Sequence, residues 1–246
     1  MGLSVNQPPI PVYLQIAERI LEQIESGKLA PGDRLPPERK LSQEFSVNRK
    51  TVRQALQVLQ LQGLLTRCQG AGTYVAEPKI EREATRLFPF TKKMLSRGYM
   101  PGGQVIMFQQ QLAGETVSRQ LRLPISTPVY TCHRLRFVNR EPVMLEKFIL
   151  PAIRFPGFEK HTLSTRSLFE IMETEYGVVI SQAQQSLEAV EATSYEAGLL
   201  GIEPGASLML ERRLSFDQNN RPVEYAKDLY RGDRFRFVTE VASLKL

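Results

Sequence analysis

The sequence has little of the chemistry that disulfide frameworks and metal centres require. Its 246 residues include only two cysteines and two histidines. Cys68 and Cys132 are too few to build a disulfide framework, and neither lies at metal-ligand spacing from His133 or His161. We therefore expect no metal site, and no sequence motif indicates a bound cofactor.

Long apolar runs are also missing. No stretch approaches the roughly 18 to 20 apolar residues that a membrane span needs. The N-terminus lacks the basic start and apolar core of a signal peptide. We therefore expect a cytoplasmic protein, and the length of the chain favours two domains over one.

A third absence concerns charge. From Ser46 through Ala76 the sequence contains no Asp or Glu, although the whole chain has 26 acidic residues. The same stretch carries the basic residues Arg49, Lys50, Arg53 and Arg67. A net charge of +6 is compatible with many kinds of partner. The local imbalance is more specific, because it predicts a surface that does not repel phosphate.

Apolar spacing in this part of the chain predicts three helices. Apolar residues recur every four positions from Val12 to Ser26, and Gly27 suits the C-terminal cap of that first helix. Pro37 can begin a short second helix. Asn48 can cap a third helix that ends before Gly63 and buries Val52, Ala55, Leu56 and Leu59. The second and third helices, separated by a short break, predict a helix-turn-helix.

The third helix and the segment after it have the features of a DNA-binding element. Cationic and hydroxyl donors occupy the helix start, where a recognition helix meets base edges: Arg49, Lys50, Thr51 and Arg53. Residues 64–69 and 73–76 predict two strands joined by a glycine-rich wing, which can approach a phosphate or the minor groove closely. Each cation alone could belong to a solvated helix face, but the combination favours DNA binding.

Beyond this module the sequence predicts a linker and a second domain. Residues 77–87 are charged and contain a proline, as is typical of a linker between domains. Four strands are predicted, with a helical stretch before the first and the third, at 129–137, 143–150, 208–216 and 223–230. We expect an α+β domain. The predicted division is a DNA-binding domain at 1–76, a linker at 77–87 and a second domain at 88–246.

A partial internal repeat agrees with this organisation. Pro124 and Pro204 lie 80 positions apart, as do Pro142 and Pro222. Each copy would contain a helix, a strand, a turn and a strand, with a longer turn in the second copy at residues 217–220. Chance similarity between short segments is the alternative.

Alternation along the predicted strands sorts the polar residues onto faces. Arg134 and Arg136 share one face of the first strand. Carboxylates from later strands could meet them, namely Glu146 and Glu224, of which the latter shares a face with Tyr230. If these faces converge, they form a pocket for an anion. The residues alone favour surface or structural salt bridges.

In three ordered motifs the chain resembles the GntR family of bacterial regulators. The motifs are residues 35–41 (LPPERKL), 48–56 (NRKTVRQAL) and 69–75 (QGAGTYV). The resemblance implies a winged helix-turn-helix whose operator contacts include Arg39, Arg49, Thr51 and Arg53, with Gly70 in the minor groove. The full set expected at the DNA is Arg39, Asn48, Arg49, Lys50, Thr51, Arg53, Gln69, Gly70 and Gly72.

The second domain resembles the UTRA-like effector domain of the HutC subfamily of GntR regulators. The likeness lies in residues 134–136, 140–143 with Glu146, 167–168, 176–177, 222–225 and 230–235. It implies a chorismate-lyase-like fold with a six-stranded antiparallel sheet that binds a small effector. The implied pocket consists of Thr91, Arg134, Arg136, Glu146, Ser167, Glu224 and Tyr230. A sugar phosphate suits two arginines and several hydroxyls, and other members respond to small acids.

These features predict a ligand-controlled repressor that binds a palindromic operator as a homodimer. The linker would transmit a ligand-induced change in the spacing of two winged helices. The alternative is an enzyme of chorismate-lyase-like fold with an accessory DNA-binding module, since fold does not decide activity. The sequence has no G-x-S-x-G elbow and no phosphate-binding glycine loop, and we expect His133 to be structural. An interaction scaffold would leave the basic helix and the wing without a role.

Overall fold

The structure is a computed structural model that describes residues 10–68, 70–87 and 89–241. It divides into two compact units, residues 1–80 and 81–246. No helix within the described ranges is long and apolar enough to cross a membrane.

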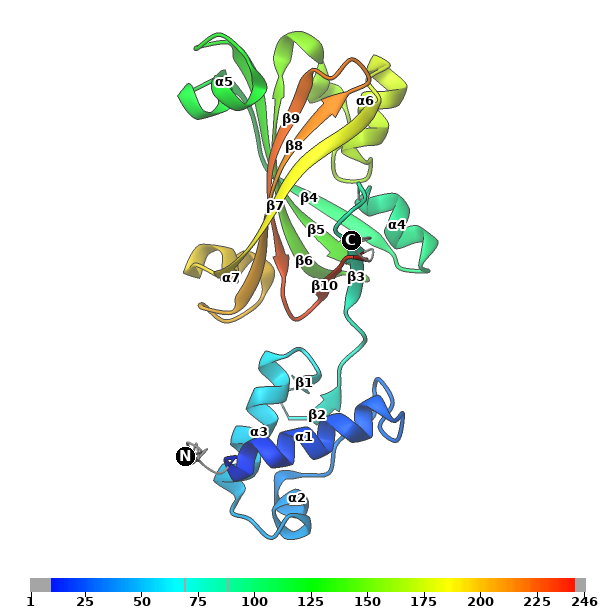
Figure 1. Ribbon diagram of the computed structural model, residues 1–246, viewed down its shortest axis with the longest axis vertical. Coiled ribbons are helices and arrows are strands. Elements are labelled where there is room, and N and C mark those ends of the chain that lie inside the picture. The colour runs from blue at the N-terminus through cyan, green and yellow to red at the C-terminus, as the bar shows by residue number, and fades with distance from the viewer. Residues whose placement is uncertain (1–9, 69, 88, 242–246) are drawn as a thin grey trace, which may run out of the picture. The chain divides into compact units, whose positions relative to one another are not determined.

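The N-terminal unit has the element order of a winged helix. Its helices are α1 (Val12–Glu25), α2 (Glu38–Glu44) and α3 (Arg49–Leu61) (Figure 1). They are followed by an antiparallel pair, β1 (Leu65–Cys68) and β2 (Gly72–Val75). The predicted three helices and glycine-linked hairpin are confirmed.

Local chemistry and packing together fix α3. The Asn48 side chain accepts a hydrogen bond from the backbone N–H of Thr51 at 2.9 Å, which satisfies one of the free donors at the helix start. The apolar face of α3 packs in one core with residues of α1. The α3 residues buried in this core are Val52, Ala55, Leu56 and Leu59. Burial of this face leaves the opposite, basic face of α3 in contact with solvent.

The segment predicted to be a linker contains a strand. Within residues 77–87, β3 (Ile80–Glu83) pairs with β10 (Phe235–Val238). Ile80 and Arg82 are both buried, whereas Glu81 between them is exposed. One of the charges in this segment, that of Arg82, is therefore buried within the C-terminal unit.

A six-stranded antiparallel sheet forms the C-terminal unit, in the order β4-β5-β6-β9-β8-β7. Its strands are β4 (Pro101–Leu112), β5 (Pro128–Val138), β6 (Glu141–Pro151), β7 (Ile180–Glu191), β8 (Ser207–Asp217) and β9 (Pro222–Arg231). The helices are α4 (Phe90–Ser96), α5 (Glu115–Leu121), α6 (Leu168–Tyr176) and α7 (Ser194–Leu200), with 3-10 turns η1 (Ala152–Arg154) and η2 (Phe158–Lys160). The predicted α+β class and antiparallel sheet are confirmed.

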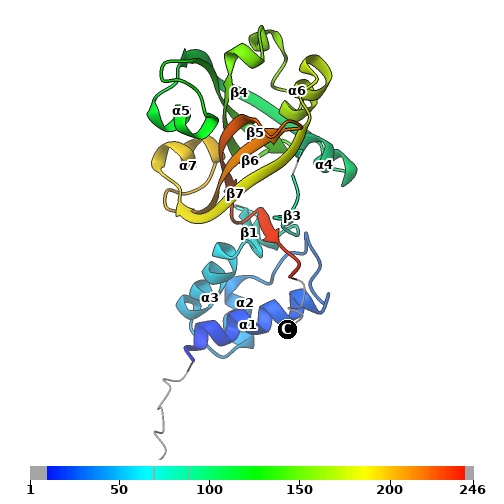
Figure 2. The ribbon, with the colours of Figure 1, turned by 45° about the horizontal axis from the view of Figure 1, so that its top comes forward.

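The internal repeat is real and longer than the sequence indicated. β4, α5 and β5 begin at residues 101, 115 and 128, and β7, α7 and β8 begin 79 positions later, at 180, 194 and 207. The last strands of the two copies, β6 and β9, lie side by side at the centre of the sheet. In both views α5 and α7 lie on one side of the sheet, and α4 and α6 on the other (Figures 1 and 2).

Residue patterns alone missed the outer strands. β7 is exposed at most of its positions, so its sequence lacks the apolar alternation of a half-buried strand. β4 has two consecutive glycines directly after its first residue, Pro101, and three glutamines directly before its last residue, Leu112; glycine and proline are unfavourable in strands. Both are edge strands, where burial gives little sequence signal.

The apolar cores leave the middle of the sheet to polar residues. On the α6 side, Phe148 and Phe158 pack with Ile171 and Met172 of the helix. On the other side, α5 and α7 cover separate clusters, one around Val129 and Ile149 and another around Leu135, Leu200 and Leu208. Charged side chains in the middle of the sheet are therefore flanked by apolar clusters and partly removed from water.

Candidate functional site

The start of α3 presents a basic surface. Arg49, Lys50 and Arg53 are exposed, while Val52 on the opposite face is fully buried. The Thr51 hydroxyl lies 3.1 Å from Asn48 Oδ1, so the cap residue also orients this hydroxyl. Donors in the first turns of a recognition helix are positioned to reach base edges and phosphates.

One acidic residue reaches this surface from α2. Glu38 accepts hydrogen bonds from Arg53 Nη2 at 2.9 Å and Nε at 3.3 Å. The hydrogen bond from Arg53, which outweighs a small burial cost, holds the pKa of Glu38 below its usual value. The stretch from Ser46 to Ala76 is acid-free in sequence, but the expectation that nothing near α3 repels phosphate is wrong, because the fold brings Glu38 against it.

Beside the wing lies a further basic residue, Arg34, which the sequence alone did not indicate. Gly70 and Gly72 both have positive φ, of 77° and 127°. A Cβ on Gly72 would lie 2.9 Å from Arg34 Nε, so glycine allows the arginine to lie along the hairpin. Arg34 and Arg67 line one groove with Glu38 and the wing glycines. Arg34 stands just before the LPPERKL motif, and backbone pairing of residues 32–35 with β2, including the hydrogen bond from Leu35 N–H to the Thr73 carbonyl, brings it there.

Of the remaining residues expected at the DNA, Arg39 is exposed on α2. Gln69 lies outside the described residues. The candidate DNA surface therefore combines the start of α3, an exposed arginine of α2 and the arginines beside the wing.

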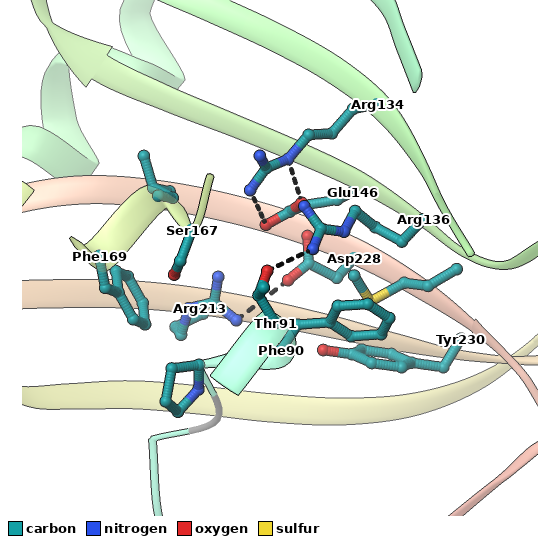
Figure 3. A pocket seen from close by; sticks show the side chains of 13 residues that line it. Phe90, Thr91, Arg134, Arg136, Glu146, Ser167, Phe169, Arg213, Asp228 and Tyr230 are labelled. Carbon is teal, nitrogen blue, oxygen red and sulfur yellow. Dashed lines mark hydrogen bonds and ion pairs between the residues drawn. The ribbon is translucent and has the colours of Figure 1, made fainter. Parts of the chain in front are cut away.

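In the C-terminal unit a cavity lies between the sheet and the starts of α4 and α6 (Figure 3). It is lined by Pro89, Phe90, Thr91, Arg134, Arg136, Met144, Glu146, Ser167, Leu168, Phe169, Arg213, Asp228 and Tyr230. Its volume is about 20 Å³, enough for little more than one water molecule. Thr91, Ser167 and Phe169 also line a larger neighbouring groove between α4 and α6, through which a ligand could enter.

Arg134 is fully engaged by the protein. Its guanidinium forms two hydrogen bonds with Glu146, of which the one from Nη2 to Oε1 is 3.1 Å long. Its Nη1 donates to the carbonyl oxygens of Leu163 at 2.7 Å and Arg166 at 3.2 Å. Only 2% of the residue is exposed. Arg134 therefore joins β5, β6 and the loop before α6, and has little donor capacity left for a ligand.

Arg136 is equally buried but poorly compensated. Its Nη2 donates to the Thr91 hydroxyl at 2.8 Å, while Nε and Nη1 have no hydrogen-bond partner in the described structure. The carboxylate of Glu146 is 4.0 Å from Nη1 and is shared with Arg134. Burial, together with the nearby Arg134 charge, lowers the pKa of Arg136 to about 10. An anion in this cavity would supply the negative charge and the hydrogen-bond acceptors that Arg136 lacks.

Asp228 and Arg213 face the same cavity from β9 and β8 (Figure 3). Arg213 Nη1 donates to Asp228 Oδ2 at 3.0 Å, and Asp228 Oδ1 has no partner in the described structure. Burial raises the pKa of Asp228 to about 8, against the opposing effect of Arg213. At neutral pH this carboxyl group is therefore largely protonated, which adds a donor and removes a negative charge that would repel an anion.

Six of the seven residues expected in the pocket line this cavity: Thr91, Arg134, Arg136, Glu146, Ser167 and Tyr230. Glu224 does not. It is fully buried behind the cavity, where it accepts hydrogen bonds from Arg213 at 2.9 and 3.2 Å. Sequence reasoning missed Arg213 and Asp228, although the repeat offered a signal, because Arg213 follows Arg134 by the same 79 positions that separate the strands.

His133 lies on the opposite face of the sheet and takes no part in the cavity. In register with it across the sheet stand Lys147, Lys227 and Arg212. Burial and the charge of Lys147 lower the pKa of His133, so that the neutral ring is favoured. No cluster of side chains that could hold a metal ion occurs among the described residues.

Comparison with known proteins identifies both units. Residues 12–75 match the family described as "Bacterial regulatory proteins, gntR family", and residues 96–236 match the UTRA domain. The chain belongs to the GntR family. This agrees with the three N-terminal motifs and with the resemblance of the second domain to HutC-type effector domains. As a GntR protein with a UTRA domain, it is a transcription regulator whose family binds DNA operators and small-molecule effectors.

Related regulators match over almost their full length. The chain is 38% identical to the HTH-type transcriptional repressor NagR of Bacillus subtilis over 96% of this chain and 97% of the relative. It is 31% identical to the mannosyl-D-glycerate transport/metabolism system repressor MngR of Escherichia coli, over 92% and 94%. The crystal structure of PhnF from Mycobacterium smegmatis is similar with a TM-score of 0.67 and 28% identity, covering 95% of this chain and 100% of that one.

Proposed function

We propose that this GntR regulator is a homodimeric repressor whose hold on a palindromic operator is controlled by a small anion in the cavity. The DNA-binding part is residues 1–76 and the effector-binding part residues 88–246, joined by 77–87. Operator binding uses the basic start of α3 and the wing, and takes place in the cytoplasm, where the chromosome is accessible. Several relatives that match more than 90% of the chain are named repressors, which favours repression over activation.

The observation that carries the ligand class is the state of Arg136. A buried guanidinium with two unpartnered nitrogens is costly unless a ligand completes its hydrogen bonds. The start of α6 lies at the same cavity, so the positive end of its dipole also favours negative charge. A phosphate or carboxylate at this point satisfies both groups.

Hydroxyl groups around the anion position favour a polyol or sugar derivative. Thr91 and Ser167 line both the cavity and the groove between α4 and α6, and protonated Asp228 can donate to a ligand oxygen. Several relatives carry names that refer to two sugar derivatives, mannosyl-D-glycerate and fructoselysine. We infer that the effector is a phosphorylated or carboxylated sugar, and that α4 and the start of α6 move apart to admit it, because the cavity alone is too small.

Thermal unfolding with a panel of anions tests this ligand class. Inorganic phosphate, glucose 6-phosphate, fructose 6-phosphate and glycerate are compared with neutral glucose and fructose. A ligand at 100 times its Kd stabilises the protein by about 2.7 kcal/mol. We expect an increase in Tm with at least one anion and none with the neutral sugars. Arg136→Gln should abolish the increase, whereas Arg212→Gln, on the other face of the sheet, should retain it. An equal increase in the Arg136 variant would contradict the assignment.

The DNA-binding part is tested with operators selected from random sequence. A dimer should select two half-sites whose centres lie about 34 Å apart, or a multiple of that distance. Selection of a single half-site with a 1:1 stoichiometry would contradict the dimer.

NMR tests the alternative of an enzyme with an accessory DNA-binding module. Recovery of the stabilising anion unchanged after long incubation with the protein would speak against this alternative.

A further inference from the structure

The strand that enters the C-terminal unit carries a buried charged side chain. Arg82, at the middle of β3, is 1% exposed and forms an ion pair with Glu211 of β8. Its guanidinium carbon lies 4.8 Å from the centre of the Tyr230 ring and 5.1 Å from that of Phe237. The segment that follows the DNA-binding unit therefore has a charged anchor inside the effector domain.

Glu211 connects this anchor to the cavity. Its Oε2 accepts hydrogen bonds from Arg213 Nη1 at 2.9 Å and from the Tyr230 hydroxyl at 3.2 Å. Arg213 and Tyr230 both line the anion cavity, and Arg213 Nη1 also donates to Asp228. One fully buried carboxylate thus contacts the linker strand through one oxygen and two cavity residues through the other.

Burial makes these contacts depend on one another. In a low-dielectric interior a carboxylate that loses one donor cannot replace it with water, so its remaining ion pair becomes stronger or shifts. A ligand that draws Arg213 or the Tyr230 hydroxyl toward the cavity therefore changes the partners of Glu211, and with them the position of Arg82. The exposed ion pair between Glu81 and Arg236, which also joins β3 to β10, has water as an alternative partner.

We propose that Arg82 and Glu211 are positioning residues that couple the anion cavity to β3. Because coupling between two sites is reciprocal, the position of β3 should also set the affinity of the cavity for its anion. This inference rests on the proposed function, since it gives the route by which the anion affects operator binding. The proposed route runs through the carboxylate of Glu211 and not through the general packing of the β3–β10 pair.

The first test measures coupling in the full-length protein with glucose 6-phosphate as the probe. Coupling is the ratio of operator Kd values with saturating and with no probe. Tyr230→Phe removes only the hydroxyl that contacts Glu211, and Glu211→Gln removes the charge. We expect both to reduce coupling at least fivefold. Glu211→Gln, which lies outside the cavity lining, should change operator Kd without probe less than twofold. Arg236→Gln is the matched control on the same strand pair and should keep coupling within twofold. Unchanged coupling in both Tyr230→Phe and Glu211→Gln would overturn the proposal.

A second test needs no ligand, so it separates this inference from the proposed function. Arg213→Lys and Arg212→Lys are the same change at neighbouring positions on opposite faces of β8. Hydrogen exchange is measured at the amides of residues 80–83. We expect at least fivefold faster exchange in Arg213→Lys and no change in Arg212→Lys. If no anion affects operator binding, the proposed function fails. The exchange rates at residues 80–83 still show whether Arg213 is coupled to β3. Equal exchange in the two variants would overturn the proposed coupling. If Arg213→Lys does not fold, Tyr230→Phe replaces it.

Discussion

The arginines of α3 and those of the cavity have the same chemistry but opposite environments. Arg53 has 63% of its side chain exposed and makes an ion pair with a partly exposed glutamate. Arg134, Arg136 and Arg213 are each at least nine-tenths buried, within a network of carboxylates. The difference separates two kinds of anion recognition.

Exposed cations suit a long polyanion. Each contact is weak and screened by salt, and affinity comes from the number of phosphates that are neutralised together. Buried cations suit one small anion, because desolvation makes each charge-assisted hydrogen bond stronger and makes any missing partner costly. The comparison predicts that equal substitutions at the two places have unequal effects on stability, on pH dependence and on salt dependence.

The largest expected effect is on folding, from Glu146→Gln. Loss of this carboxylate leaves Arg134 without its ion-pair partner and Arg136 without its nearest negative charge. Breaking a buried pair in this way costs about 3–5 kcal/mol of unfolding free energy. Glu188→Gln, which breaks the exposed pair with Arg212, should cost no more than about 1 kcal/mol. Urea denaturation measures both, and similar losses would remove the distinction between the two environments.

The next effect is a pH dependence that arises from Asp228. Burial raises the pKa of this carboxyl group from 3.8 to about 8, so the folded protein binds its proton more tightly than the unfolded chain. The stabilisation is therefore complete below the unfolded pKa and is lost as pH rises through about 8. Relative to Asp228→Asn, the wild-type protein should lose roughly 1 kcal/mol of unfolding free energy per pH unit between pH 5 and 8.

Urea denaturation of both proteins at several pH values checks this slope. The lowered pKa values of Glu146 and Glu211 affect stability at acid pH in both proteins, so they largely cancel in the difference. A difference that does not change with pH would show that Asp228 is ionised throughout.

A smaller effect is expected on operator binding, from Arg49→Gln. Loss of one phosphate contact should reduce affinity about tenfold and lower the salt slope by about 0.9. Arg136→Gln should leave the slope unchanged, since its guanidinium is buried. Fluorescence anisotropy between about 50 and 200 mM salt measures both slopes. A lower slope in the Arg136 variant would place that residue in the DNA surface.

The smallest effect concerns the acid on the DNA surface. Glu38→Gln removes the charge that is paired with Arg53 and leaves that guanidinium free to contact phosphate. We expect about two- to threefold tighter binding to random-sequence DNA, because one more exposed cation becomes available. Competition between operator and random DNA measures the effect. Weaker binding to both would indicate that Glu38 mainly positions Arg53.

Local sequence signals predicted the DNA-binding unit well. Caps, helical apolar spacing and glycines act over a few residues, so Asn48, Val52 and Gly70 each indicate structure at their own position. The placement of Glu38 against Arg53 could not be predicted in this way, because it depends on how α2 packs on α3.

Only part of the cavity could be predicted from the sequence. Strand alternation put Arg134 and Arg136 on one face, and the resemblance added Thr91 and Ser167, all of which line the cavity. Alternation cannot tell which of two neighbouring arginines is compensated. That distinction depends on Glu146, which is in register with Arg134, and on two carbonyl groups from a distant loop.

The most direct test of this account measures operator Kd for the wild-type protein and for Arg136→Gln, each with and without the anion that raises Tm most. We expect at least a tenfold change in the wild-type protein and less than a twofold change in the variant, with equal Kd values in the absence of the anion. An anion response in Arg136→Gln equal to that of the wild type would contradict the claim that this buried arginine senses the effector.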